Sequence, residues 1–160
     1  MKKYANDHKF QVGLKPCTVL VSSLEDYKMG LSKLHVVIVD DNGSKAREIR
    51  KVLERNGIRD VDEARDQEKL WEMIYGNADG VKKPDLIVTD MQYPLASGSG
   101  IDPEAGFKLI ERMQKEQVDI PVIICSECNY DGVRGILGSV HFRWDDDLFF
   151  PFKEVLGRLK

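Results

Sequence analysis

Three aspartates stand directly after two apolar runs of this sequence. Asp40 and Asp41 follow the run from Leu34 to Val39, and Asp90 ends the run that begins at Asp85. Short β-branched apolar runs of this kind are typical of buried strands in a parallel sheet. The carboxyl ends of such strands share one edge, where ligands bind. If the two strands are neighbours, the carboxylates converge there, and a hard divalent ion, most simply Mg²⁺, is their natural counter-charge.

The elements that must position these acids alternate along the chain. We expect strands over residues 34–39, 60–64, 85–90, 121–125 and 139–142, and helices over residues 44–56, 67–75, 102–117 and 148–159. This alternation predicts an α/β protein with helices on both faces of a parallel sheet. Glycines and polar residues between Ser126 and Gly138 leave room only for a short or irregular helix.

Residues 1–32 lie outside this scheme and are interpreted as an N-terminal extension to a domain of residues 33–160. Within the extension, Thr18 to Ser22 could form a strand and Leu24 to Leu31 a short helix.

Size and composition narrow the class of protein. The 160 residues suit one compact domain, with 42% apolar and 32% charged residues. A net charge of -3 disfavours a nucleic-acid reader, and we expect neither a secretory signal nor a membrane span. Three cysteines fit a reducing cytoplasm, where Cys125 would be buried and Cys128 incidental, with Cys17 elsewhere. The histidines His8, His35 and His141 lack ligand spacing, so no metal is assigned to them.

Four segments in order resemble the response-regulator receiver family of two-component signalling, and the resemblance extends from about Leu34 to the C-terminus. The segments that carry it are Val39-Asp40-Asp41-Asn42, Val88-Thr89-Asp90-Met91-Gln92-Tyr93-Pro94, Gly106-Phe107-Lys108-Leu109-Ile110 and Pro121-Val122-Ile123-Ile124-Cys125-Ser126. The resemblance implies a flavodoxin-like, doubly wound sheet of five parallel strands in the order 2-1-3-4-5.

The resemblance also implies a role for each residue of the site. Asp90 would accept a phosphoryl group from a histidine kinase or a phosphotransfer protein. Asp41 and Asp90 would bind Mg²⁺ with the backbone carbonyl of Gln92, and Asp40 would support the ion through water. The hydroxyl of Ser126 would hydrogen-bond the phosphoryl group and couple it to a change of shape.

Three features depart from the family pattern. Receivers carry a lysine after the fifth strand, but this sequence has Phe142 and Arg143 there, or Phe150 if Phe150-Pro151-Phe152 replaces the family's Lys-Pro-Phe. Arg143 is a weak substitute, since a guanidinium differs from an ammonium in shape and reach. An insertion from Leu95 to Ile101 is expected to form a flexible loop above the acids. The third departure is the shortened segment after Ser126.

These observations leave several functions open. The leading one is a stand-alone phosphoacceptor that is not an enzyme and signals through contacts with an unknown output protein. The alternative is a pseudo-receiver that binds partners independently of phosphorylation, which the missing lysine favours. A phosphatase of the haloacid-dehalogenase type is disfavoured because Gln92 stands where a second acid is usual. The aromatic residues Trp144, Phe149, Phe150 and Phe152 are expected to be core or docking residues for the last helix, or else to form an exposed patch for a homodimer or another partner.

Overall fold

The computed structural model describes residues 26–76 and 80–160. Residues 26–32 are helical, in agreement with the later part of the helix expected there. The strand predicted from Thr18 to Ser22, together with Cys17 and His8, lies outside the described residues.

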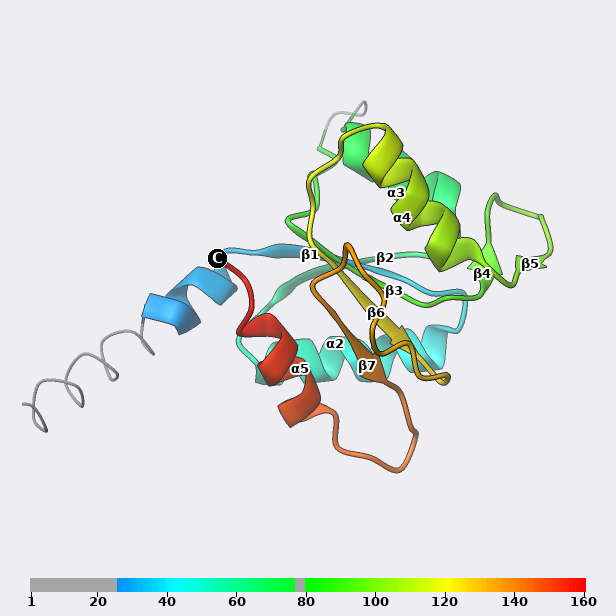
Figure 1. Ribbon diagram of the computed structural model, residues 1–160. Helices are drawn as coiled ribbons and strands as arrows, with labels where there is room; N and C mark the ends of the chain where they lie inside the picture. Colours follow the sequence, from blue (N-terminus) through cyan, green and yellow to red (C-terminus); the bar gives the residue numbers. More distant parts are fainter. Residues whose placement is uncertain (1–25, 77–79) are drawn as a thin grey trace, which may run out of the picture.

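Five strands form one parallel sheet, which runs through the middle of the molecule (Figure 1). Their order is β2-β1-β3-β6-β7, which confirms the predicted order 2-1-3-4-5. All residues of the three central strands, β1, β3 and β6, are buried, and most of them are apolar. The bounds are β1 His35–Val39, β2 Asp60–Ala64, β3 Leu86–Thr89, β6 Val122–Ser126 and β7 Gly138–His141.

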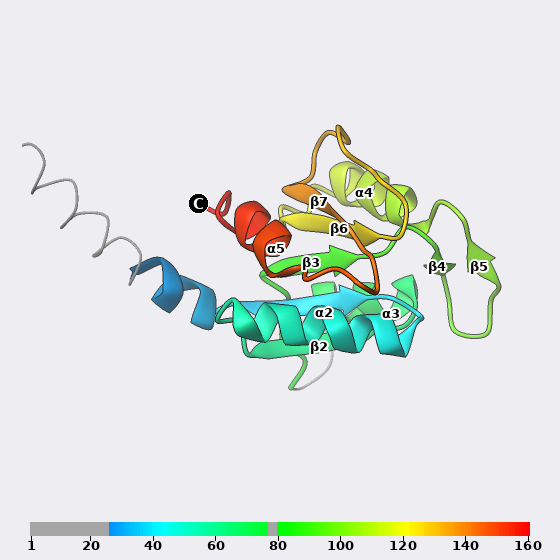
Figure 2. The ribbon, with the colours of Figure 1, turned by 90° about the horizontal axis from the view of Figure 1, so that it is seen from below.

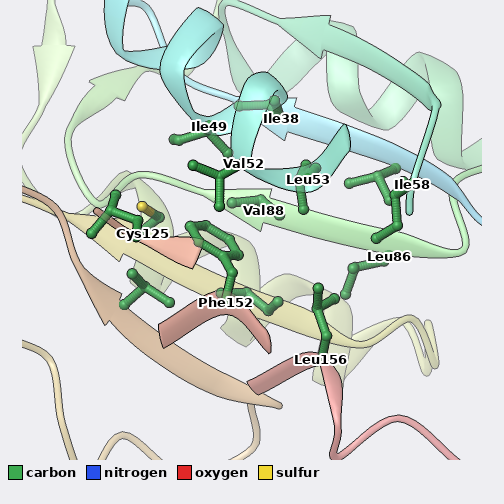
Figure 3. Packing of buried hydrophobic residues seen from close by; sticks show 14 of the residues in the cluster. Ile38, Ile49, Val52, Leu53, Ile58, Leu86, Val88, Cys125, Phe152 and Leu156 are labelled. Atoms are coloured by element: carbon green, nitrogen blue, oxygen red, sulfur yellow. The ribbon is translucent and has the colours of Figure 1, made fainter. Parts of the chain in front are cut away.

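Two helices cover each face of the sheet (Figures 1 and 2). On one face lie α2 (Gly43–Arg55) and α5 (Phe149–Leu156), and on the other lie α3 (Gln67–Tyr75) and α4 (Ala105–Lys115). Each pair encloses its own apolar layer against the strands. Figure 3 shows the first layer, in which Phe152 of α5 lies between the sheet and the apolar side chains of α2.

The aromatic residues near the C-terminus divide between the core and the surface. Phe152 is completely buried, whereas Trp144 and Phe150 are more than half exposed, at 55% and 69%. Phe152 therefore docks the last helix as expected. Whether the exposed pair forms a dimer patch stays a prediction.

The insertion after β3 is more regular than the sequence suggests. Tyr93–Pro94 (β4) pairs antiparallel with Ile101–Asp102 (β5), so the expected flexible loop is a hairpin. Ser99 closes its tip by hydrogen bonds to Ala96 in both directions. The hairpin lies beyond the carboxyl ends of the strands, beside the acidic edge (Figure 2).

The helical content differs from expectation in two places, at the start of α4 and in the segment after Ser126. The fourth expected helix begins at Ala105 instead of Asp102, because Asp102 pairs in the hairpin and its side chain accepts a hydrogen bond from the Glu104 N–H, forming a turn. Residues 127–137, all described, contain only turns and bends, so the segment after Ser126 has no helix.

Within the described ranges, no helix has the length and apolar character needed to cross a bilayer.

Candidate functional site

The three aspartates converge at the carboxyl edge of the sheet. Strands β1 and β3 are direct neighbours, and the Asp90 N–H donates to the Val39 carbonyl at 2.9 Å. As a result, one carboxylate oxygen from each of Asp40, Asp41 and Asp90 lies within 4.8 Å of the others. Asp40 is buried, and the other two are partly exposed. The predicted convergence is confirmed.

Backbone hydrogen bonds hold two of the carboxylates in fixed orientations. Asp40 Oδ1 accepts from the Asn42 N–H at 2.9 Å, and Asp90 Oδ1 accepts from the Met91 N–H at 2.7 Å. No described residue donates to the carboxylate of Asp41 or to Oδ2 of Asp90. Those oxygens are therefore available to a ligand.

A buried lysine that the sequence interpretation missed lies between the acids. Lys45 Nζ is 3.0 Å from Asp40 Oδ2 and 3.1 Å from Asp90 Oδ1, and its side chain is only 3% exposed. The contact with Asp40 is a buried ion pair, in which the ammonium engages Asp40 Oδ2. Lys45 comes from the first turn of α2, where Asn42 Oδ1 caps the helix by accepting from the N–H groups of Ser44 and Lys45.

Burial and charge act on this group of residues in opposite directions. Burial raises the pKa of Asp40 to about 6, although Lys45 nearby lowers it. Burial alone would lower the pKa of Lys45, but the carboxylates of Asp40 and Asp90 outweigh burial and raise it. Lys45 is therefore a charged ammonium group in a site that excludes most water.

The sequence contains a weak signal for Lys45. It lies four residues before Ile49 and seven before Val52, and both of these face the core. A lysine at that spacing falls on the buried stripe of the helix. It also stands in the first turn, where the helix dipole disfavours a cation, so an acidic partner was to be expected.

The other predicted cation does not reach the acids. β7 ends at His141, so Phe142 and Arg143 directly follow the fifth strand, and the register that uses Phe150 is not the one formed. Phe142 is buried, with its ring centroid 5.5 Å from Lys45 Nζ. Arg143 is exposed and makes no ion pair with any described acid, so the cation that contacts Asp90 is Lys45.

The remaining predicted residues border one cavity above the acids. Its volume is about 320 Å³, and Gln92 and Ser126 are in its wall with Asp41, Lys45 and Asp90. Ser126 ends β6 and is buried, and its Oγ accepts from the Cys128 N–H at 3.3 Å. Further wall residues come from the hairpin and from the loop after β6: Ile101, Glu127 and Cys128.

Cys125 and Cys128 have different environments and are not joined. Cys125 is buried and Cys128 is exposed, and both are free thiols. This confirms the expected burial of Cys125. Burial raises the pKa of Cys125 to about 12, so it is a protonated core side chain near neutral pH.

The oxygen atoms of the acids fit a hard divalent ion. Among the described residues, these three aspartates are the one group of potential metal ligands that lie close together. Asp41 and Asp90 Oδ2 offer charged oxygens without protein donors, whereas both oxygens of Asp40 are engaged by Asn42 or Lys45. The donor set therefore suits direct ligation by Asp41 and Asp90, with Asp40 in a supporting place.

Comparison with known proteins agrees with the fold. The family described as the response regulator receiver domain matches residues 36–135. That match covers more than half of the 160 residues, so this chain belongs to the receiver domain family. No curated protein matches the chain.

Solved structures of receiver domains share the fold at low sequence identity. The N-terminal domain of a response regulator/sensory box/GGDEF protein from Carboxydothermus hydrogenoformans is 22% identical, with a TM-score of 0.54, and the match covers 77% of this chain and 94% of that one. The phosphorylated cyanobacterial phytochrome response regulator RcpA is 19% identical, with a TM-score of 0.56 and coverage of 78% and 89%. The Mn²⁺-bound response regulator Rcp1 is 21% identical, with a TM-score of 0.54 and coverage of 78% and 90%. These likenesses establish a flavodoxin-like receiver fold.

Proposed function

We propose that this receiver domain is a phosphoacceptor in a two-component phosphorelay and that Asp90 is the residue that receives the phosphoryl group. The observation that carries the proposal is the state of the Asp90 carboxylate. Its Oδ1 is held by Met91 and Lys45, whereas no residue in the described part of the chain donates to its Oδ2, which lies beside a cavity large enough for a phosphoryl group. A nucleophile fixed on one side and free on the other is aligned for in-line attack.

The step is a transfer between a phosphohistidine donor and a carboxylate. Oδ2 of Asp90 forms a bond to phosphorus while the bond from phosphorus to the donor's imidazole nitrogen breaks, and the departing electron pair stays on that nitrogen. The product is an acyl phosphate on Asp90 and a free histidine on the partner. Mg²⁺, held by Asp41, Asp90 and the backbone carbonyl of Gln92, would neutralise charge on the transferring oxygens.

Ser126 is the residue that would couple phosphorylation of Asp90 to a change in conformation. Its hydroxyl is in the wall of the same cavity, where it could turn from the Cys128 N–H to an oxygen of the phosphoryl group. Such a turn would draw the loop after β6 toward Asp90. We infer that the output is a contact with another protein, made by surfaces that this loop displaces.

Intact-mass measurement tests the proposal. After incubation with acetyl phosphate and Mg²⁺, the wild-type protein should gain one phosphoryl group, and Asp90→Asn should gain none. Asp145→Asn is a matched control because Asp145 is exposed and lies outside the cavity. An unmodified wild-type protein, both with this donor and with a phosphorylated histidine phosphotransfer protein, would refute the proposal.

A pseudo-receiver is the second candidate function, and the buried ion pair favours it. Lys45 already neutralises part of the cluster, so the fold of a pseudo-receiver would not depend on an ion or a phosphoryl group. This candidate predicts that acetyl phosphate, added to protein already saturated with Mg²⁺, leaves the amide NMR spectrum unchanged. Displaced resonances around Ser126 would contradict it.

A further inference from the structure

Lys45 reaches the acids from the first turn of α2, the helix that directly follows β1 in the sequence. The segment after the fifth strand supplies no cation to the acids, because Phe142 is buried there and Arg143 is exposed. Phe142 borders the ammonium of Lys45, with the ring 5.5 Å from Nζ, so the aromatic side chain covers the place from which a second cation would approach.

The position of Lys45 is fixed at both ends. Its backbone N–H is held by the Asn42 cap, and its Nζ bridges Asp40 and Asp90 at 3.0 and 3.1 Å. A side chain that is 3% exposed cannot turn out to solvent without opening the core. Its charge is therefore a permanent part of the site, and it reduces the formal charge of the three carboxylates from -3 to -2.

The fixed positive charge of Lys45 affects the affinity of the site for a divalent ion. Any ion held by Asp41 and Asp90 would lie close to the ammonium, since Nζ itself is 3.1 Å from Asp90 Oδ1. Even with the dielectric constant of water, a divalent ion about 6 Å from a unit positive charge is repelled by an energy that corresponds to roughly tenfold in affinity. Inside a partly buried site the repulsion is larger.

We propose that Lys45 is the built-in counter-ion of the acidic cluster, which keeps Asp40 and Asp90 together without metal and weakens the binding of divalent ions to this site. In the unphosphorylated protein, Asp41 and Asp90 Oδ2 are the oxygens left for the ion. The role of Asp90 as acceptor rests on the proposed function, but ion binding and stability are measured without any phosphoryl transfer. A protein that fails to become phosphorylated would refute that function and leave this inference standing.

Titration with Mn²⁺ by isothermal calorimetry tests the inference. Lys45→Met keeps most of the length of the side chain and removes its charge, so it should bind Mn²⁺ roughly tenfold more tightly than wild type. Lys51→Met is the matched control, because Lys51 lies on the same helix, is 59% exposed and, among the described residues, pairs only with Glu48. It should bind Mn²⁺ within about twofold of wild type because exposed charges are screened. Unchanged or weaker binding by Lys45→Met would overturn the proposal.

Thermal unfolding supplies a second readout. With EDTA, Lys45→Met should unfold at a lower temperature than wild type, and Mn²⁺ should raise its unfolding temperature by more than it raises that of wild type. If Lys45→Met does not fold in EDTA, the double variant Asp40→Asn with Lys45→Met removes both buried charges and should fold. That double variant should still bind Mn²⁺ at least as tightly as wild type, and weaker binding would count against the inference. Equal stabilisation of all variants by Mn²⁺ would also overturn it.

Discussion

Gly106 packs so closely against the backbone of Asp90 that its replacement by alanine is expected to destabilise the protein. Gly106 is in the first turn of α4, and its N–H donates to the Met91 carbonyl at 3.0 Å. A Cβ at Gly106 would lie 2.9 Å from the Asp90 carbonyl oxygen and 3.0 Å from Met91 Sδ. The first of these neighbours is backbone, so either the acceptor loop or the helix must move.

Two opposing effects decide whether Gly106→Ala raises or lowers the free energy of unfolding. A helical glycine replaced by alanine normally gains up to about 1 kcal/mol. Overpacking in a rigid environment costs about 1–3 kcal/mol. For Gly106→Ala the second effect is larger, and we expect a net loss of about 1 kcal/mol in the free energy of unfolding. Since the displaced atoms belong to Asp90 and Met91, phosphorylation from acetyl phosphate should slow as well.

Urea unfolding and intact-mass kinetics measure the two effects. Gly30→Ala is the control because Gly30 is also helical and exposed, and a Cβ there has no neighbour within 4 Å. It should leave the rate of phosphorylation unchanged and keep or raise stability. A Gly106→Ala protein that is as stable as Gly30→Ala and is phosphorylated at the wild-type rate would refute the reasoning about this contact.

Three further predictions concern the surroundings of the site. Tyr93→Phe removes a buried hydroxyl that accepts from Thr89 Oγ1 at 3.1 Å, so urea unfolding should show a loss of about 1 kcal/mol; an equal or higher stability would show that the hydroxyl contributes nothing. Asn42→Ala removes the side-chain cap of α2 and should lower stability by about 1 kcal/mol, with unchanged unfolding as the contrary result. Because burial raises the pKa of Cys125 to about 12, iodoacetamide at pH 8 should alkylate Cys128 and spare Cys125 until urea is added; mass mapping that finds Cys125 labelled in the native protein would contradict its burial.

The strands and the acids were predictable because their signals are local. A buried central strand requires a short run of apolar residues, and the run that ends at Val39 is interrupted by an acid where the chain leaves the sheet. Parallel pairing of β1 with β3, which the family resemblance implied, then brings Asp40 and Asp90 together. The second helix was predicted at its observed bounds, Gln67–Tyr75, because Asp66 caps it and Gly76 ends it in a left-handed conformation.

The position of Lys45 was harder to predict because it depends on tertiary packing. A lysine within a helix usually faces solvent, and only the contact with two carboxylates makes its burial favourable. The hairpin after β3 was missed for a related reason. Its glycines and serines indicate flexibility, whereas the pairing of Tyr93 with Asp102 depends on where α4 begins. Both features depend on contacts between different segments of the chain, and a local sequence pattern contains no information about such contacts.

A crystal structure of the protein with Mg²⁺ and beryllium trifluoride, a mimic of the phosphoryl group, tests the central claim most directly. We expect the mimic on Oδ2 of Asp90, Mg²⁺ between Asp41 and Asp90, and Lys45 still in contact with the Asp90 carboxylate. A mimic that does not bind, or one that binds with the Asp90 side chain turned away from Asp41, would contradict the account.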